Sequence, residues 1–172
     1  MGKIPGLVVV LALLIPLITA GCVNTVADAR EWNAKGETDH VMGRYNEAVA
    51  AYDQAVTLDP AYGEAWRNRG LSLALLNRTS ESEESYQKAL MIDPQDMEAL
   101  YYQAVSRAYS GNTPGALESI NMTVAITPKN RDDAIILTQA YTLKGDLLTG
   151  LGRIEEANLS YRQAHETMMS TI

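Results

Sequence analysis

Apolar positions recur along most of the chain with the spacing of amphipathic helices. The apolar residues of one helix face lie three or four positions apart, and positions 48, 52 and 55 show this spacing with Ala, Tyr and Ala. Prolines at positions 60, 94 and 128 lie 34 residues apart, which is the length of two short helices and their turns. The pattern therefore predicts an all-α chain built from repeated helix pairs.

Equivalent residue types align when the chain is compared with itself at this period. The aligned sets hold the same large or small residue: Trp32 and Trp66, Gly36 and Gly70, Tyr52 and Tyr86, Ala55 and Ala89. Four predicted turns hold residues that adopt a left-handed backbone at low cost: Gly43, Asn77, Gly111 and Gly152. This pattern resembles the tetratricopeptide repeat (TPR). The resemblance implies an all-α, right-handed α-solenoid of about four helix-turn-helix repeats that binds a protein without catalysis.

The fourth copy is displaced by seven residues from the strict period. We therefore place the repeats at about 29–62, 63–96, 97–130 and 138–171, with 131–137 as an inserted extension. Seven residues are nearly two helical turns, so we expect one longer helix over 131–150 that protrudes by about two turns; a longer loop is the alternative. We also expect Asp59 to cap the following helix and Ser80 with Glu83 to form a capping box.

The N-terminus resembles a bacterial or archaeal lipoprotein signal. Lys3 precedes an apolar run, and small residues lead to Cys22, the single cysteine. The run is too short to span roughly 30 Å of hydrocarbon comfortably. We predict an N-terminal signal helix within 1–21, a lipidated Cys22 and a short tether over 22–28, with the repeats on the outer face of the cell membrane. Because Thr19 stands where the motif usually has a large aliphatic residue, an ordinary signal peptide or an uncleaved anchor is the alternative.

Composition excludes several kinds of chemistry. The formal charge of −7 repels phosphate backbones, so we predict no nucleic-acid partner. One cysteine and two histidines offer no internal disulfide and little basis for a metal site. The sequence shows no nucleophile–base set and no phosphate-binding loop. We therefore predict a protein that is not an enzyme and has no cofactor, no metal site and no catalytic residue.

The TPR resemblance implies that the first helix of each pair lines a concave wall. Transferring the family's wall positions predicts these partner-binding residues: Arg67, Leu71, Leu75, Tyr101, Val105 and Tyr109. The same transfer places Gln139, Thr142 and Asp146 on the wall in the fourth repeat. An apolar and aromatic wall suits an extended peptide or a partner helix, with Arg67 as an orienting donor. The alternative is that Leu71, Leu75 and Val105 belong partly to the core.

Some TPR domains hold a C-terminal carboxylate with a Lys/Asn/Arg cluster. Of the matching positions here, only Asn68 carries the family's residue, and Glu37 and Glu98 carry the wrong charge. The resemblance therefore does not extend to that binding mode. Asn77, in the triplet Asn77-Arg78-Thr79, is a candidate N-glycosylation site at a predicted turn.

Two other roles fit the sequence. In the first, the last helix is uncapped and joins copies of the chain into a homo-oligomer, or a structural subunit of an envelope complex, through Met168, Met169 and Ile172. In the second, the protein is an accessory to a membrane enzyme. The leading prediction is an interaction scaffold for a protein or peptide partner, attached to the membrane through its N-terminus.

Overall fold

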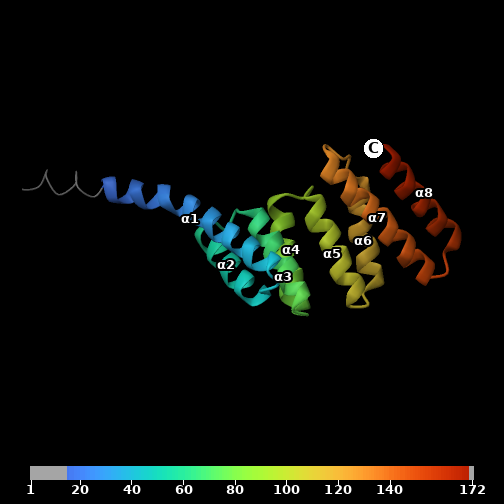
Figure 1. The fold of residues 1–172 in the computed structure, drawn as a ribbon, viewed down its shortest axis with the longest axis horizontal. Helices are drawn as coiled ribbons and strands as arrows, with labels where there is room; N and C mark the ends of the chain where they lie inside the picture. Colours follow the sequence, from blue (N-terminus) through green and yellow to red (C-terminus); the bar gives the residue numbers. More distant parts are fainter. Residues whose placement is uncertain (1–14, 171–172) are drawn as a thin grey trace, which may run out of the picture. The chain divides into compact units, whose positions relative to one another are not determined.

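The protein is all-α over the part of the chain that the computed structural model describes. The description covers the backbone of residues 15–170 and the side chains of residues 28–170. Within it lie eight helices: α1 (Ile15–Val41), α2 (Tyr45–Leu58), α3 (Gly63–Leu75), α4 (Thr79–Ile92), α5 (Met97–Tyr109), α6 (Thr113–Ala125), α7 (Arg131–Gly150) and α8 (Ile154–Ser170) (Figure 1). The chain divides into two compact units, residues 1–62 and residues 63–172.

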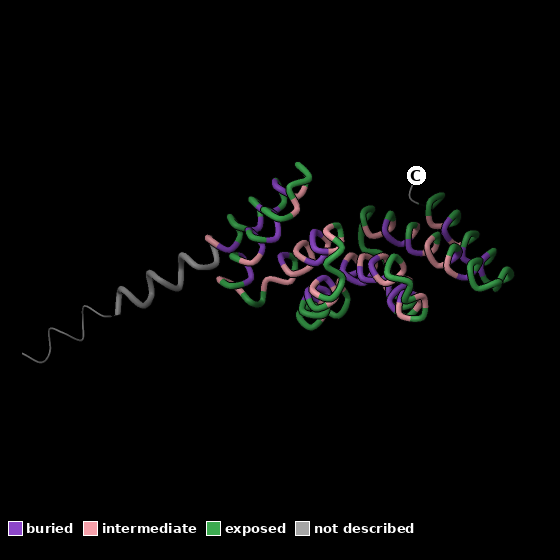
Figure 2. Tube along the Cα trace, turned by 90° about the horizontal axis from the view of Figure 1, so that it is seen from below, coloured by how far each residue is buried: buried purple, intermediate pink, exposed green. Residues whose placement is uncertain are grey.

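Consecutive helices pack in pairs, as the period predicts. The first unit holds α1 and α2, which pack on each other, and the second unit holds the pairs α3–α4, α5–α6 and α7–α8. Within the second unit α3 contacts α5 and α5 contacts α7, whereas the described parts of α4, α6 and α8 make no such contacts with one another. The first helices of this unit therefore lie on the inner side of its curve. Buried residues follow the sides on which the helices meet (Figure 2).

The described part of the first helix reaches further toward the N-terminus than the first repeat helix that the sequence predicts. Residues 22–28, expected as a tether, are helical and continuous with the first repeat helix. Between Pro16 and Val41 the sequence holds no proline that would interrupt this helix. Among the described helices, none is both long and apolar enough to cross a bilayer.

A small residue facing a large one sets the spacing of each helix pair. In three pairs a glycine of the first helix lies against a tyrosine ring of the second: Gly36 and Tyr52, Gly70 and Tyr86, Gly145 and Tyr161. In α5 and α6 the same two positions hold Ala104 and Ile120, which form a core cluster with Ala140. Ala104 has a methyl group that the glycines of the other pairs lack, and Ile120, which faces it, is smaller than the tyrosines of those pairs.

The turns between paired helices have the predicted backbone. The four turn residues all have positive φ: Gly43 at 73°, Asn77 at 58°, Gly111 at 80° and Gly152 at 72°. Glycine and asparagine adopt this left-handed conformation with little strain.

The predicted helix caps are wrong in two places. Asp59 ends α2, and its carboxylate accepts a hydrogen bond from the Ala61 N–H at 3.0 Å in the turn before α3. It therefore shapes the connecting turn and does not cap the next helix. Glu83 does not bond back to the start of α4, because it faces α5: it accepts from Gln103 Nε2 at 2.9 Å and from Arg107.

Arg107 stands where the aligned repeats have Leu73 and Leu148, and it connects three helices. Its guanidinium donates to the Glu83 carboxylate on α4, at 3.2 Å from Nε, and to the Ser119 hydroxyl on α6 at 2.8 Å. Ser119 in turn donates to Gln103 at 2.8 Å. A connected polar network therefore replaces apolar packing between the second and third pairs.

The seven-residue insertion is helical, and its residues become buried only at its C-terminal end. α7 runs from Arg131 to Gly150 as one helix, as expected. Asn130 caps it by accepting from the Asp133 N–H at 2.8 Å. Ile136 and Leu137 are buried, so the last turn of the insertion does not protrude, whereas Ile135 is exposed.

Candidate functional site

The inner side of the second unit carries two neighbouring grooves. The first lies between α5 and α7 and has a volume of about 470 Å³. The second lies between α3 and α5, reaches the start of α4, and has a volume of about 320 Å³. Val105 and Tyr109 line both grooves. We call the two grooves together the groove face.

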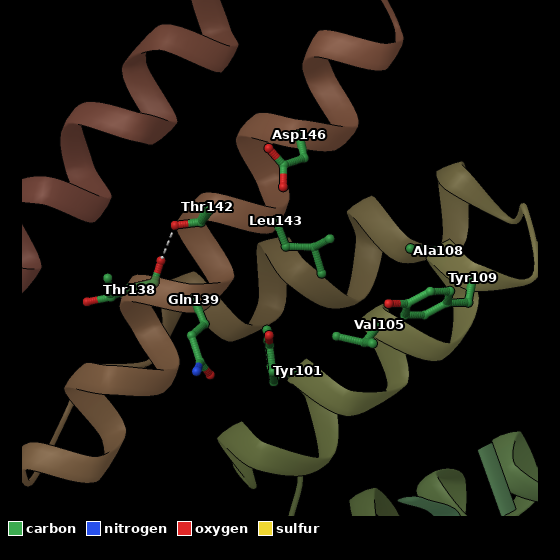
Figure 3. A pocket seen from close by; sticks show the side chains of 9 residues that line it. All are labelled: Tyr101, Val105, Ala108, Tyr109, Thr138, Gln139, Thr142, Leu143 and Asp146. Atoms are coloured by element: carbon green, nitrogen blue, oxygen red, sulfur yellow. Dashed lines mark hydrogen bonds between the residues drawn. The ribbon is translucent and has the colours of Figure 1, made fainter. Parts of the chain in front are cut away.

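The α5/α7 groove combines an apolar floor with a few polar groups. On α5 it is lined by Tyr101, Val105, Ala108 and Tyr109, and on α7 by Thr138, Gln139, Thr142, Leu143 and Asp146 (Figure 3). Both threonines are used internally, because each donates to the carbonyl oxygen four residues earlier at 2.9 Å. The amide of Gln139 and the carboxylate of Asp146 remain at the exposed rim.

The α3/α5 groove is lined by uncharged residues. Its apolar and aromatic walls come from Leu71, Leu75, Tyr102 and Val105, and Tyr109 stands 89% exposed between the two grooves. A large apolar ring that is mostly exposed beside a groove is available to anchor a partner. The groove face therefore offers aromatic contact area rather than a reactive group.

Five of the six predicted partner-binding residues line the groove face, and Arg67 does not. Arg67 lies in a separate hollow, where its guanidinium pairs with Asp96 at 2.9 Å and with Glu98 at 3.1 Å. Burial acts to lower the pKa of Arg67, but Asp96 and Glu98, together with Glu64, outweigh it and raise the pKa. Arg67 is thus held in ion pairs that join α3 to the start of α5.

Tyr101 and Tyr102 are neighbouring, half-buried rings on α5. Burial raises the pKa of both Tyr101 and Tyr102, and their rings pack with centroids 5.4 Å apart. Tyr102 and Leu143 line the grooves although they are absent from the predicted set. The sequence gives little indication of their role, because each directly follows a residue at a family wall position and is not at such a position itself.

The two predicted modification sites differ in what the structure describes. Cys22 falls within α1, and its side chain lies outside the described residues, as do residues 1–14 of the predicted signal. Asn77 is exposed at the turn between α3 and α4 and lines the α3/α5 groove. The described residues contain no cluster of His, Cys, Asp and Glu that could hold a metal ion.

Comparison with known families identifies the repeats. Models of the tetratricopeptide repeat match residues 41–96 and residues 138–166. The chain contains tetratricopeptide repeats. The first match covers the α2–α4 region, and the second lies within α7 and α8, after the seven-residue insertion. Among curated protein sequences, none matches this chain.

Solved structures support the same fold. A crystal structure of MamA is similar with a TM-score of 0.75 at 21% identity, covering 83% of this chain and 80% of that chain. The Arabidopsis OM64 TPR domain is similar with a TM-score of 0.60 at 19% identity, covering 67% of this chain and 96% of that one. The first TPR of Spaghetti (RPAP3), bound to the HSP90 peptide SRMEEVD, is similar with a TM-score of 0.59 at 18% identity, covering 67% of this chain and 91% of that chain. At these identities the likeness establishes the fold alone.

Proposed function

We propose that this protein is a non-catalytic scaffold that binds a protein or peptide partner on its groove face. The observation that carries the proposal is the pair of adjoining grooves, lined by five of the six predicted residues, with Tyr109 exposed between them. Clefts that are mostly apolar and hold a few polar groups are the usual sites of ligand binding. A TPR neighbour bound to a peptide supports peptide binding as the mode.

The acidic HSP90 peptide of that neighbour is a poor guide to the ligand here. Glu98 stands at a position of the family's carboxylate-binding cluster and is already paired with Arg67 at 3.1 Å. Glu37, at another such position, accepts a hydrogen bond from Asn33 at 2.9 Å. Carboxylates at these positions would repel a terminal carboxylate. We therefore propose recognition of an internal segment through apolar and aromatic contacts.

We further propose that the scaffold is exported and held at the outer face of the membrane through a lipidated Cys22. The support is the sequence pattern alone: an apolar run, small residues and then the single cysteine. Mass spectrometry of the N-terminal peptide from the native membrane tests this proposal. Acylation of Cys22, lost in Cys22→Ser together with membrane association, is the expected result. An unmodified Cys22 in a membrane-bound protein would refute lipidation.

Site-specific cross-linking tests the groove face. A photo-crosslinking amino acid in place of Tyr109 should capture one defined partner from native membranes. The same group in place of Met91, which is exposed on α4 outside both grooves, is the matched control. Tyr101→Ala with Tyr109→Ala should abolish capture by a cross-linker placed at Gln139, with an unchanged helical circular dichroism spectrum. Equal capture from positions 91 and 109 would exclude the groove face as the binding surface.

An oligomeric role through α8 is a second candidate, because α8 exposes apolar side chains. Tyr161 is 36% exposed, whereas the aligned Tyr86 and Ile120 are fully buried, and Met168 and Met169 are also exposed. Exposed apolar patches are typical of interaction surfaces. Met168→Ser with Met169→Ser should lower the mass measured by sedimentation without affecting capture at position 109. A mass that does not depend on these residues would exclude this role.

A further inference from the structure

The two grooves of the groove face differ in charge. No charged side chain lines the α3/α5 groove, and one charged side chain, Asp146, lines the α5/α7 groove. We propose that the α5/α7 groove binds an arginine or lysine side chain of the partner while the α3/α5 groove takes a neighbouring apolar side chain. This inference rests on the proposed function and names the chemistry of its ligand.

Asp146 is placed to receive a cation from outside the chain. It lies on α7 at the rim of the groove, across from Ala108 and Tyr109 on α5 (Figure 3). One of its oxygens accepts a hydrogen bond from the Tyr161 hydroxyl at 2.8 Å, which orients the carboxylate. Among the described residues, no lysine or arginine forms an ion pair with Asp146, whereas Asp39, Glu83 and Asp96 each have such a partner.

The rest of the groove fits the aliphatic part and the head of a basic side chain. Val105, Ala108 and Leu143 give the floor an apolar surface for a methylene chain. Tyr101 and Tyr109 supply rings on which a guanidinium or ammonium group can rest. A volume of about 470 Å³ is ample for one long side chain together with part of the partner backbone.

Other side chains fit this groove less well. An acidic side chain would be repelled by Asp146. An apolar side chain would remove water from the carboxylate without replacing its hydrogen bonds, which is unfavourable. A basic side chain both covers the floor and neutralises the charge, so charge complementarity selects it.

Capped tetrapeptides test the inference on the full chain. The probes are acetyl-Leu-Ala-Ala-Arg-amide and the same peptide with Gln or Glu in place of Arg, titrated at low salt and followed by NMR shifts of residues on α5 and α7. We expect the Arg peptide to bind about threefold tighter than the Gln peptide, since a solvent-exposed ion pair contributes modestly. The Glu peptide should bind more weakly than both.

Two variants with the same charge change separate the groove from general attraction. Asp146→Asn should remove the preference for Arg and leave the Gln peptide unaffected, because the asparagine oxygen can still accept from Tyr161. Asp132→Asn, on the same helix but outside both grooves, should leave the preference intact. The inference is supported if affinity decreases from the Arg to the Gln to the Glu peptide, and if Asp146→Asn but not Asp132→Asn removes the preference for Arg.

Three outcomes would overturn it. Equal affinity for the Arg and Gln peptides would leave the groove face as a peptide site and refute the role of Asp146. An equal loss of preference in Asp132→Asn would assign the preference to the acidic protein as a whole. If none of the three peptides binds at concentrations up to about 10 mM, which an NMR titration can reach, the inference is also overturned. Cross-linking at position 109 would then test the proposed function separately.

Discussion

Replacing Gly70 by alanine should weaken the protein although alanine favours helices. A Cβ at position 70 would lie 2.8, 2.9 and 3.1 Å from three ring carbons of Tyr86, where ordinary contacts begin at 3.4 Å. The ring would have to move by several tenths of an ångström. Tyr86 is fully buried and lines the α3/α5 groove, so a shift of its ring would disturb both its packed neighbours and the groove.

The size of the effect follows from two opposing contributions. Alanine in place of glycine in a helix interior stabilises by about 0.5–1 kcal/mol. Overpacking a buried site costs about 1–3 kcal/mol. α3 cannot shift away from α4 freely, because the Ser82 hydroxyl donates to the Gly70 carbonyl at 2.8 Å in the buried interface. We therefore expect Gly70→Ala to lower the free energy of unfolding by about 1 kcal/mol.

The equivalent change at Gly145 is the matched control. Its Cβ would also meet a tyrosine ring, that of Tyr161, but this ring is partly exposed and can swing outward, giving up its exposed hydrogen bond to Asp146. Gly145→Ala should therefore change the free energy of unfolding by less than about 0.5 kcal/mol. Urea unfolding followed by circular dichroism measures both variants, compared by their transition midpoints because repeat proteins can depart from two-state behaviour.

A second substitution tests the reason for the loss. Tyr86→Ile copies the natural pair of Ala104 and Ile120, in which an alanine faces a smaller side chain. Tyr86→Ile should lower the free energy of unfolding less in the Gly70→Ala protein than in the wild type. The difference, which is the coupling energy of the double-mutant cycle, should be about 1 kcal/mol. Equal stability of Gly70→Ala and Gly145→Ala, or additive effects in the cycle, would refute the contact between Gly70 and Tyr86 as the cause.

Two further predictions concern charged groups. Arg107→Leu should lower the free energy of unfolding by about 1–3 kcal/mol, because it leaves the half-buried Glu83 without its cation. Adding Glu83→Gln should recover part of this loss, as measured by urea unfolding. If nothing is recovered, the loss of the ion pair is not the cause. Hydrogen bonds from Lys35, at 2.9 Å, and from Arg44 lower the pKa of Asp39. The stability that this carboxylate contributes is therefore present above its unfolded pKa of about 4 and lost as the pH falls through the lowered folded value. Unfolding midpoints measured against pH should fall less steeply below about pH 4 in Asp39→Asn, and an identical slope would contradict the prediction.

Local features were predictable from the sequence because their causes are local. The left-handed turns at Gly111 and Asn77 follow from sterics at one residue, and the helix over Arg131–Gly150 follows from an insertion of nearly two turns. The contact of Arg107 with Glu83 joins residues that are 24 positions apart on different repeats. A period gives the order of the repeats but not which polar atoms meet between them.

The two sides of α5 make different contacts. Tyr101, Val105 and Tyr109 are spaced four residues apart and line the grooves. Gln103 and Arg107 bond to residues of the second helices that flank α5. The groove residues of α5 are therefore carried on a helix that is fixed from its other side, which limits the entropy lost when a partner binds. On the proposed function, such a fixed apolar surface beside the carboxylate of Asp146 would discriminate between partners by shape and charge without a conformational change.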